Sequence, residues 1–251
     1  MLPVLCPDWP APPHVQALCT TREGGVSAPP YDRLNLGLHV QDEVQAVLRN
    51  RDLLGQACGT RPIFLSQVHG IEVAHIDSRT SDGTQADACW TDTPGAACTI
   101  MVADCLPVLF TDKSGRSVAA AHAGWRGLAA GVLEATLAQV CRASHCEPSE
   151  VLAWLGPCIG PRAFEVGDDV RQAFGGEGCP ANSFLPTGQP GKWWADLGWL
   201  ARWRLHRAGV SALYGNDSTS AWCTVSQSSR FFSYRRDGRS GRFAACIWLT
   251  S

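Results

Sequence analysis

The chain has 251 residues, of which 45% are hydrophobic and 18% charged, with a formal net charge of −2. This length supports one sizeable core, and the small net charge excludes a global basic field for nucleic acid or acidic membranes. No apolar run reaches the roughly 18–20 residues that span a bilayer, and the start MLPVLCPDWPAPPH lacks the Lys or Arg of a signal peptide. We therefore expect one cytoplasmic domain over residues 1–251, a monomer or homodimer, with no nucleic-acid or membrane partner.

Twelve cysteines are spread along the chain. Because there is neither an export signal nor a C-x-x-C pair, neither a disulfide framework nor a zinc ribbon is favoured. Most stand singly among apolar or small residues, where cysteine serves as a small buried hydrophobe. Cys105 and Cys158 are the exceptions, in the segments ADCLP and GPCIGPR.

In the first part of the chain, residues 15–21 predict a strand, followed by a loop rich in glycine and proline. Asp42 is placed to cap a helix. The apolar residues that follow at helical spacing are Val44, Val47, Leu48 and Leu54. Residues 63–70 and 71–76 alternate like two strands around a turn at Gly70.

Later strand-like runs occupy residues 97–102, 108–111, 117–121, 151–156, 211–215 and 243–249. Residues 127–142 and 192–209 predict two long amphipathic helices, and residues 168–174 a short one. Residues 175–191 predict a mobile loop. Because strands and helices mix without a strict βαβ rhythm, the pattern favours an α+β fold with mixed sheets in a single compact domain.

The run MVADCLPVLF, residues 101–110, is apolar except for an acid, a thiol and a proline. We interpret it as two strands joined at Asp104 and Cys105, with Pro107 preventing regular pairing just past the thiol. No glycine motif of the dinucleotide or P-loop type follows a strand, so those modes of nucleotide binding lose support.

Three strand-like runs end in a polar residue beside glycine or proline: FLSQVHG, MVADCLP and VAAAHAGWRG. Their chemically active residues are His69, Cys105 and His122. Two imidazoles and a thiolate suit Zn²⁺, and three protein ligands leave a fourth position open, as in catalytic zinc sites. The same residues also permit a metal-free dyad in which Cys105 is the nucleophile and His122 its base.

Several arginines follow the same segments and could bind an anion such as phosphate through charge-assisted hydrogen bonds. They are Arg126 in HAGWRG, Arg22 in TTREGG and Arg235 in FFSYRRDGRSGR. Ser233 lies in that last segment, and Glu165 in WLGPCIGPRAFEVG, as further polar candidates.

At these residues the chain resembles the YfiH family, also called the multicopper polyphenol oxidase or laccase-domain family, which includes purine nucleoside phosphorylases. The resemblance covers nearly the whole chain in order. Its motifs are TTREGGVSAPPYDRLNLGLHV, NRDLL, SQVHG, the Asp87–Ala88 pair, VADCLPVLF, AAAHAGWRG, LGPCIGPRAFEVG, DLGWLARWRLHRAGV and FFSYRRDGRSGR.

The resemblance implies an α/β/β/α-type layered fold and a zinc ion bound by His69, Cys105 and His122. It also implies phosphorolysis of adenosine, inosine, guanosine and methylthioadenosine to base and sugar 1-phosphate, with adenosine deamination as a second activity. For such a reaction, Asp104 and a set of other polar residues are candidates to meet the purine or ribose. The others are Gln67, Asn35 and Glu165.

Alternatives stay open at this stage. Asp104 could instead orient one of the zinc-binding histidines, a common arrangement around zinc. The protein could be a cysteine hydrolase that edits cell-wall precursors, or a non-catalytic binding protein with an aromatic-rich surface. Copper oxidation is the weakest reading, because seven histidines are too few for a mononuclear and a trinuclear copper cluster.

Overall fold

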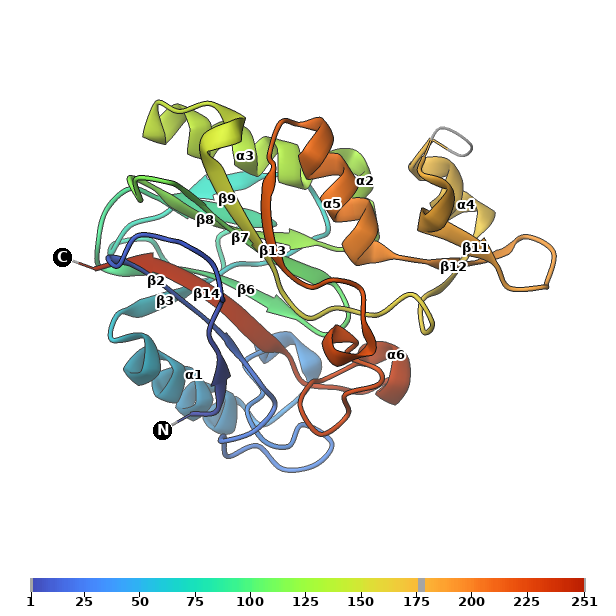
Figure 1. The fold of residues 1–251 in the computed structure, drawn as a ribbon. Coiled ribbons are helices and arrows are strands. Elements are labelled where there is room, and N and C mark those ends of the chain that lie inside the picture. The colour runs from blue at the N-terminus through green and yellow to red at the C-terminus, as the bar shows by residue number, and fades with distance from the viewer. Residues whose placement is uncertain (1, 176–178, 251) are drawn as a thin grey trace.

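The computed structural model describes residues 2–175 and 179–250, and two sheets packed face to face form its centre (Figure 1). One sheet has the strand order β1 (Val4–Leu5), β2 (Val15–Thr20), β14 (Phe243–Leu249), β6 (Ala96–Val102) and β3 (Arg61–Phe64). The other has the order β13 (Ala212–Gly215), β9 (Val151–Leu155), β7 (Leu106–Asp112), β8 (Val118–Ala123), β5 (Ala88–Thr91) and β4 (Val73–His75). Both sheets mix parallel and antiparallel pairs.

Helices cover the outer face of each sheet (Figure 1). Helix α1 (Val44–Cys58) lies against the five-stranded sheet. The helices over the six-stranded sheet are α2 (Trp125–Ala130), α3 (Val132–Ser144) and α5 (Leu197–Arg207). The layers therefore run helix, sheet, sheet, helix, which confirms the expected α+β class and the α/β/β/α arrangement in one compact domain.

Smaller elements extend one end of this body. A three-stranded sheet has the order β10 (Glu165–Gly167), β12 (Lys192–Ala195) and β11 (Phe184–Pro186). Helix α4 (Asp168–Ala173) packs against it, and helix α6 (Tyr234–Asp237) precedes the last strand. None of the helices in the described part of the chain is both long and apolar enough to cross a membrane.

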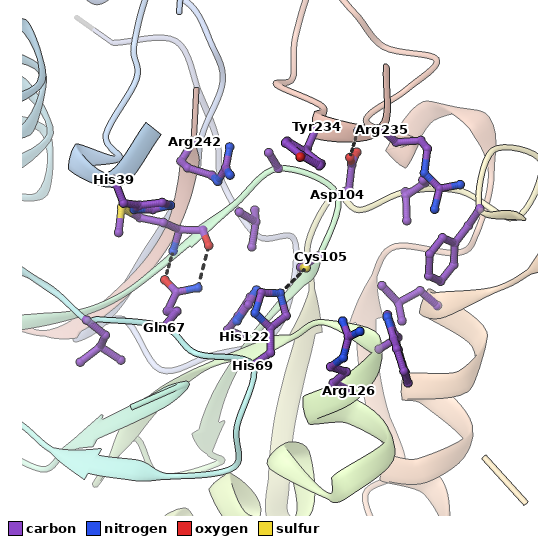
Figure 2. Close-up of a pocket in the computed structure, with 18 of the residues that line it drawn as sticks. His39, Gln67, His69, Asp104, Cys105, His122, Arg126, Tyr234, Arg235 and Arg242 are labelled. Carbon is purple, nitrogen blue, oxygen red and sulfur yellow. Dashed lines mark hydrogen bonds between the residues drawn. The ribbon is translucent and has the colours of Figure 1, made fainter. Parts of the chain in front are cut away.

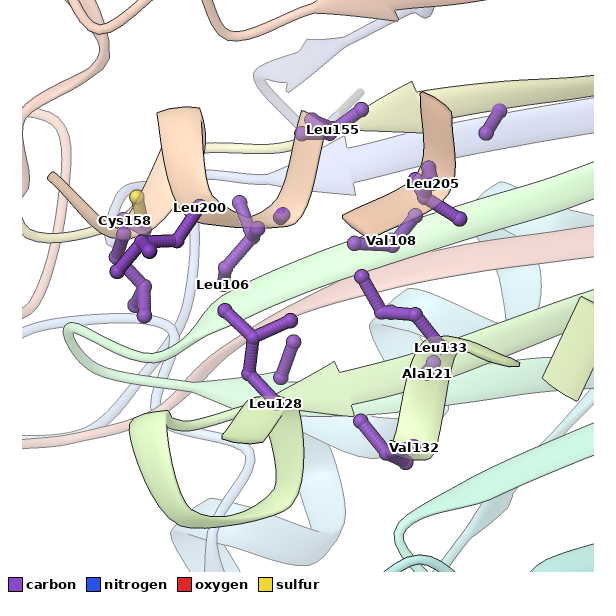
Figure 3. Packing of buried hydrophobic residues seen from close by; sticks show 14 of the residues in the cluster. Leu106, Val108, Ala121, Leu128, Val132, Leu133, Leu155, Cys158, Leu200 and Leu205 are labelled. Carbon is purple, nitrogen blue, oxygen red and sulfur yellow. The ribbon is translucent and has the colours of Figure 1, made fainter. Parts of the chain in front are cut away.

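The apolar core forms three clusters, one at each interface between layers. Strands β6, β7 and β8 are buried along their whole length because sheet or helix covers both of their faces. Alternation then sends successive side chains to opposite interfaces: Val108 packs toward α3, while Leu109 packs between the sheets. Figure 3 shows the outer cluster, where Leu106 and Val108 meet Leu133 of α3 and residues of α5.

The run at residues 101–110 does form two strands, but they belong to different sheets. Residues 103–105 carry the chain from the end of β6 across to the start of β7. Contrary to our expectation, Pro107 lies within β7, opposite His122, and its carbonyl accepts from the N–H of Gly156 at 2.9 Å. In a strand, the N–H and the carbonyl of one residue lie on the same side, so the N–H that proline lacks would face β9 and not β8. Because β9 has already ended at this position, the missing N–H breaks no bond to it, and the pairing of β7 with β8 is unaffected.

The two strands predicted on either side of Gly70 are present in shorter form, but they do not pair with each other across a turn. Strand β3 stops at Phe64 and β4 begins at Val73, and these two strands lie in different sheets. The segment between them turns away because the N–H groups of residues 68–70 bond to a side chain rather than to a neighbouring strand.

Both long helices are shorter than the periodicity predicted. The first is divided into α2 and α3 at Gly131, whose φ of 107° only glycine adopts easily. In the second, residues 192–195 are strand β12, and Asp196 caps α5 by accepting from the N–H of Trp199 at 2.8 Å. The cap decides where that helix begins, since the preceding Trp pair fits a strand equally well.

Two other local predictions need correction. Helix α1 begins after Glu43, and Asp42 instead binds the side chain of Asn35 at 2.9 Å. The stretch predicted as a loop at residues 175–191 contains strand β11, and its residues 176–178 lie outside the described part of the chain.

Candidate metal centre and active site

A cavity of about 700 Å³ opens where β6 and β8 end and β7 begins. Figure 2 shows His69, Cys105 and His122 together at its centre, although they lie on three separate segments. His122 is in β8 and only 4% exposed, Cys105 stands just before β7, and His69 is in the loop before β4. The tertiary structure therefore joins the three residues that the sequence singled out.

The donor atoms of these residues are spaced as a metal ion requires. Cys105 Sγ lies 3.7 Å from Nε2 of His69, the two imidazole centroids are 4.8 Å apart, and all three donor atoms lie within 4.8 Å of one another. A tetrahedral zinc with bonds of about 2.3 Å to sulfur and about 2.0–2.1 Å to nitrogen separates such donors by roughly 3.5 Å. The donor set could therefore hold a metal ion such as zinc with small movements of the side chains, and three protein ligands would leave a fourth position for water or substrate.

Glycine at position 124 allows this close approach. A Cβ atom there would lie 2.7 Å from Cδ2 of His69 and 3.0 Å from Sγ of Cys105. Both distances are shorter than van der Waals contact, so any side chain at this position would displace two of the three donors.

Asp87, which precedes β5 and is fully buried, binds the segments that carry both histidines. Its Oδ1 accepts from Nδ1 of His122 and from the backbone N–H of His69, each at 2.8 Å. Its Oδ2 accepts from the N–H groups of Val68 at 3.1 Å and Gly70 at 2.7 Å. Sequence reasoning noted Asp87 only as part of a family motif and gave it no role.

The three ionisable groups favour charged forms together. Burial raises the pKa of the Cys105 thiol, but His122 and His69 outweigh it and lower that pKa to about 6. Burial lowers the pKa of His122, but Cys105 and Asp87 outweigh it and raise that pKa to about 9. Burial also raises the pKa of Asp87, whereas hydrogen bonds from His122 and Gly70 bring it down to about 2. Without metal, the site thus favours a thiolate beside an imidazolium.

Asp104 lines the cavity, where a group that meets the substrate would lie, but the bonds of its carboxylate are not to either histidine. Its carboxylate accepts from Oγ1 of Thr224 at 2.6 Å and from the backbone N–H of Arg235 at 2.7 Å. It therefore ties the crossover between the sheets to the start of α6, and Asp87 takes the histidine-orienting part instead.

Three guanidinium groups line the cavity: Arg126, Arg235 and Arg242. Arg126 lies over the ring of Trp125 at 4.4 Å, and Arg235 lies over Phe164 at 5.6 Å. No ion pair between described residues includes any of the three arginines. The three guanidinium groups therefore bring positive charge to the cavity, which suits an anion, although the carboxylate of Asp104 also lines it and acts on Arg242.

Gln67 also lines the cavity, but its amide already bonds the backbone of Met101, donating to the carbonyl at 2.8 Å and accepting from the N–H at 2.9 Å. Figure 2 shows both bonds beside His39 and Arg242. Sequence reasoning assigned no site role to His39 or Arg242, although both line the cavity together with Tyr234. Arg242 is the last residue of FFSYRRDGRSGR, so the motif was a usable signal.

Other predicted site residues do not line this cavity. Arg22 pairs with Asp32 at 3.4 Å in a separate surface depression. Asn35 is fully buried and bonds the backbone at Gly37 and Arg242. The carbonyl of Glu165 accepts from Arg235 at 3.1 Å, and Ser233 caps α6.

Cys158, which the sequence set apart, is buried in the outer apolar cluster and accepts from the amide of Asn216 at 3.3 Å. Burial, the first of several causes, raises the pKa of this thiol well above its ordinary value. Cys158 is therefore an inert core residue, in contrast to Cys105.

Comparison with known proteins shows which family the chain belongs to. Residues 16–250 match the family model described as multi-copper polyphenol oxidoreductase laccase. A purine nucleoside phosphorylase of Pseudomonas aeruginosa is 54% identical over 246 residues, covering 98% of each chain. The purine nucleoside phosphorylase YfiH of Escherichia coli is 48% identical over 252 residues, covering 99% of this chain and 100% of its own.

Solved structures of relatives share the fold. The crystal structure of a Neisseria meningitidis protein superposes with a TM-score of 0.91 at 48% identity, covering 99% of both chains. That of the Bacillus licheniformis hypothetical protein YfiH gives a TM-score of 0.87 at 30% identity, covering 94% of this chain and 93% of its own. The chain therefore belongs to the multi-copper polyphenol oxidoreductase laccase family, as the resemblance to YfiH proteins indicated.

Proposed function

We propose that this protein is a zinc-dependent purine nucleoside phosphorylase that also deaminates adenosine. Its substrates would be adenosine, inosine, guanosine and methylthioadenosine, with phosphate as the second substrate. The names of its relatives support the phosphorylase class. The observation that carries the proposal is the cavity itself, which combines a His-Cys-His donor set with three guanidinium groups that form no ion pair among the described residues. We place this activity in the cytoplasm, in a monomer or homodimer.

Phosphorolysis requires a phosphate oxygen to form a bond to C1′ of the ribose while the bond from C1′ to the purine nitrogen breaks. The phosphate must therefore be held beside the sugar, and Arg126 and Arg235 are suited to do this by charge-assisted hydrogen bonds. The ring of Trp125 offers a flat apolar wall on which a purine could stack.

Both activities depend on the metal in this proposal, and its chemical part is most direct in the second. Zinc at His69, Cys105 and His122 would supply the Lewis acidity that adenosine deamination needs to activate a water molecule. Around it, the chain's own residues hold the donors in place, exclude bulk water through the apolar wall and keep the thiol deprotonated.

The test is an incubation of the zinc-loaded protein with adenosine, with and without phosphate, followed by product analysis. We expect adenine and ribose 1-phosphate when phosphate is present, and inosine in either case. The proposal is rejected if neither product exceeds the background measured with the Cys105→Ala variant.

The phosphate assignment predicts a specific kinetic change. Arg126→Ala and Arg235→Ala should each raise the KM for phosphate by about 10-fold or more, because a hydrogen bond to a charged group contributes roughly 1.5–3 kcal/mol. Arg22→Ala is the matched control, since its guanidinium lies outside the cavity and pairs with Asp32. Equal effects of all three substitutions on the KM would contradict the assignment.

A second function has one observation in its favour. Cys105, His122 and Asp87 form a chain of nucleophile, base and orienting acid, the arrangement of cysteine hydrolases. In such an enzyme, the Cys105 thiolate would attack the carbonyl carbon of an amide, for instance in a mis-assembled cell-wall precursor. The C–N bond would break, the amine would leave with a proton from His122, and water would hydrolyse the resulting thioester. Alkylation of Cys105 by iodoacetamide separates the two functions: protection by zinc supports the metal enzyme, and labelling that zinc does not slow supports the hydrolase.

A further inference from the structure

We propose that Asp87 is the positioning residue of the metal centre, fixing both histidines at once through a single carboxylate. The inference rests on the proposed metal site, but not on which reaction the site performs. Asp87 is 0% exposed and accepts four hydrogen bonds, two on each oxygen. These bonds reach two segments that are otherwise far apart in the chain, the loop at residues 68–70 and strand β8.

His122 is fixed to Asp87 at two points. Its backbone N–H donates to the carbonyl of Asp87 at 2.7 Å, and its Nδ1 lies 2.8 Å from Oδ1 of the same residue. An ionised carboxylate can only accept, so Nδ1 must carry the proton. A metal would displace the second proton of the imidazolium, the one on Nε2, and take up the lone pair of that nitrogen beside Cys105.

His69 depends on Asp87 through its backbone. Its φ of 63° is in the left-handed region, which a non-glycine residue adopts only when its surroundings hold it there. Three successive N–H groups, those of Val68, His69 and Gly70, converge on the carboxylate of Asp87. This convergence stabilises the turn and so directs the His69 ring toward Cys105, 3.7 Å from its Sγ.

An amide cannot replace this carboxylate. Both oxygens of Asp87 accept from N–H donors, whereas an asparagine side chain has one acceptor oxygen and one NH₂ group that only donates. In one orientation the NH₂ would face His69 and His122, and in the other it would face Val68 and Gly70. Asp87→Asn must therefore release one of the two histidine-bearing segments, although the shape of the side chain hardly changes.

The experiment measures metal binding without any substrate. Asp87→Asn should weaken Zn²⁺ affinity by about 10–100-fold in competition with a chelator, the range found for residues behind a metal's ligands. In the Co²⁺-substituted protein, the ligand-field and thiolate charge-transfer bands should shift in position and intensity, because the donor geometry changes. Wild-type affinity and an unshifted Co²⁺ spectrum in the variant would overturn the proposal.

Asp112→Asn is the matched control. Asp112 is 2% exposed and also accepts four hydrogen bonds, from Ser144 Oγ and from the N–H groups of Ser114, Arg116 and Ser117. This substitution should lower the urea midpoint of unfolding yet leave Zn²⁺ affinity and the Co²⁺ spectrum unchanged. An equal loss of Zn²⁺ affinity in both variants would show that general destabilisation is the cause, which overturns the role of Asp87.

A measurement on the unaltered protein keeps the proposal testable if Asp87→Asn does not fold. In the zinc-loaded wild type, NMR of ¹⁵N-labelled imidazoles should show His122 protonated at Nδ1 and metal-bound at Nε2. A proton on Nε2 of His122 would contradict the inference. Because no nucleoside is present, either result stands whether or not phosphorolysis is detected.

Discussion

Asp87 and Asp112 lie at opposite ends of the β7–β8 pair, and each is a buried carboxylate that accepts four hydrogen bonds. At the Asp112 end, the donors are mostly groups of the turn at residues 114–117, and Ser144 closes the cluster by also bonding Ser117 at 2.7 Å. At the Asp87 end, two donors belong to histidines whose rings continue toward Cys105 and an open cavity.

The difference shows what separates a structural polar cluster from a functional one. Both carboxylates hold a loop against a strand by the same kind of bond, so burial and bond number do not distinguish them. What distinguishes the Asp87 end is the donor atoms of His69, Cys105 and His122, which lie within 4.8 Å of one another beside the cavity. Polar groups that are satisfied only in part inside a fold call for a ligand.

The largest expected effect removes a donor at the cavity end. Cys105→Ala should reduce bound zinc from near one per chain to background and abolish both activities, because the two remaining imidazoles bind zinc weakly. The metal-free variant and metal-free wild type should unfold at nearly the same temperature, since the thiol is a small part of the core. Elemental analysis and calorimetry decide this; zinc retained at wild-type stoichiometry would exclude Cys105 as a ligand.

A smaller effect is expected at the opposite end. Ser144→Ala removes the hydroxyl that joins Asp112 and Ser117, so the free energy of unfolding should fall by about 1–2 kcal/mol. Zinc content and the KM for phosphate should stay at wild-type values. A change in zinc affinity would mean that the two ends of β7 and β8 are coupled, which would contradict a purely structural role for the Asp112 cluster.

The smallest effect is a pH dependence at the rim of the cavity. Burial, together with the positive charges of Arg242, Arg51 and His122, lowers the pKa of His39. Below its ordinary pKa of about 6.5, the unfolded chain therefore binds a proton that the folded protein does not, so stability falls as the pH drops toward the folded pKa. Solvent screening keeps this effect small, because the side chain is partly exposed.

His39→Gln tests that reading. The shift in the urea midpoint between pH 7.5 and pH 5.5 should be smaller in this variant than in the wild type, since glutamine does not titrate. His206→Gln is a suitable control, because that histidine lies on α5 and does not line the cavity. An equal shift in the urea midpoint in the wild type and in His39→Gln would show that His39 does not cause the loss of stability at low pH.

Much of the fold was predictable because hydrophobic periodicity is a local property. It placed the buried strands around residues 97–102 and 108–111 and the apolar helices over the six-stranded sheet. Periodicity failed where one local feature sets the end of a helix or strand. These features are the cap at Asp196, the left-handed backbone of Gly131 and the carboxylate of Asp87, which binds residues 68–70. Each of these depends on one hydrogen bond or one dihedral angle, which an average over many residues cannot register.

By itself the sequence identified the three candidate donors, since His69, Cys105 and His122 each follow an apolar run and are residue types that bind metals. Only the tertiary structure decided which other residues serve them. It brought in Asp87, 35 positions from His122, and Arg242, while it sent Arg22 to another surface. The physical reason is that a hydrogen bond or a shared cavity depends on distance in space, and two sheets packed face to face join segments that the order of residues keeps apart.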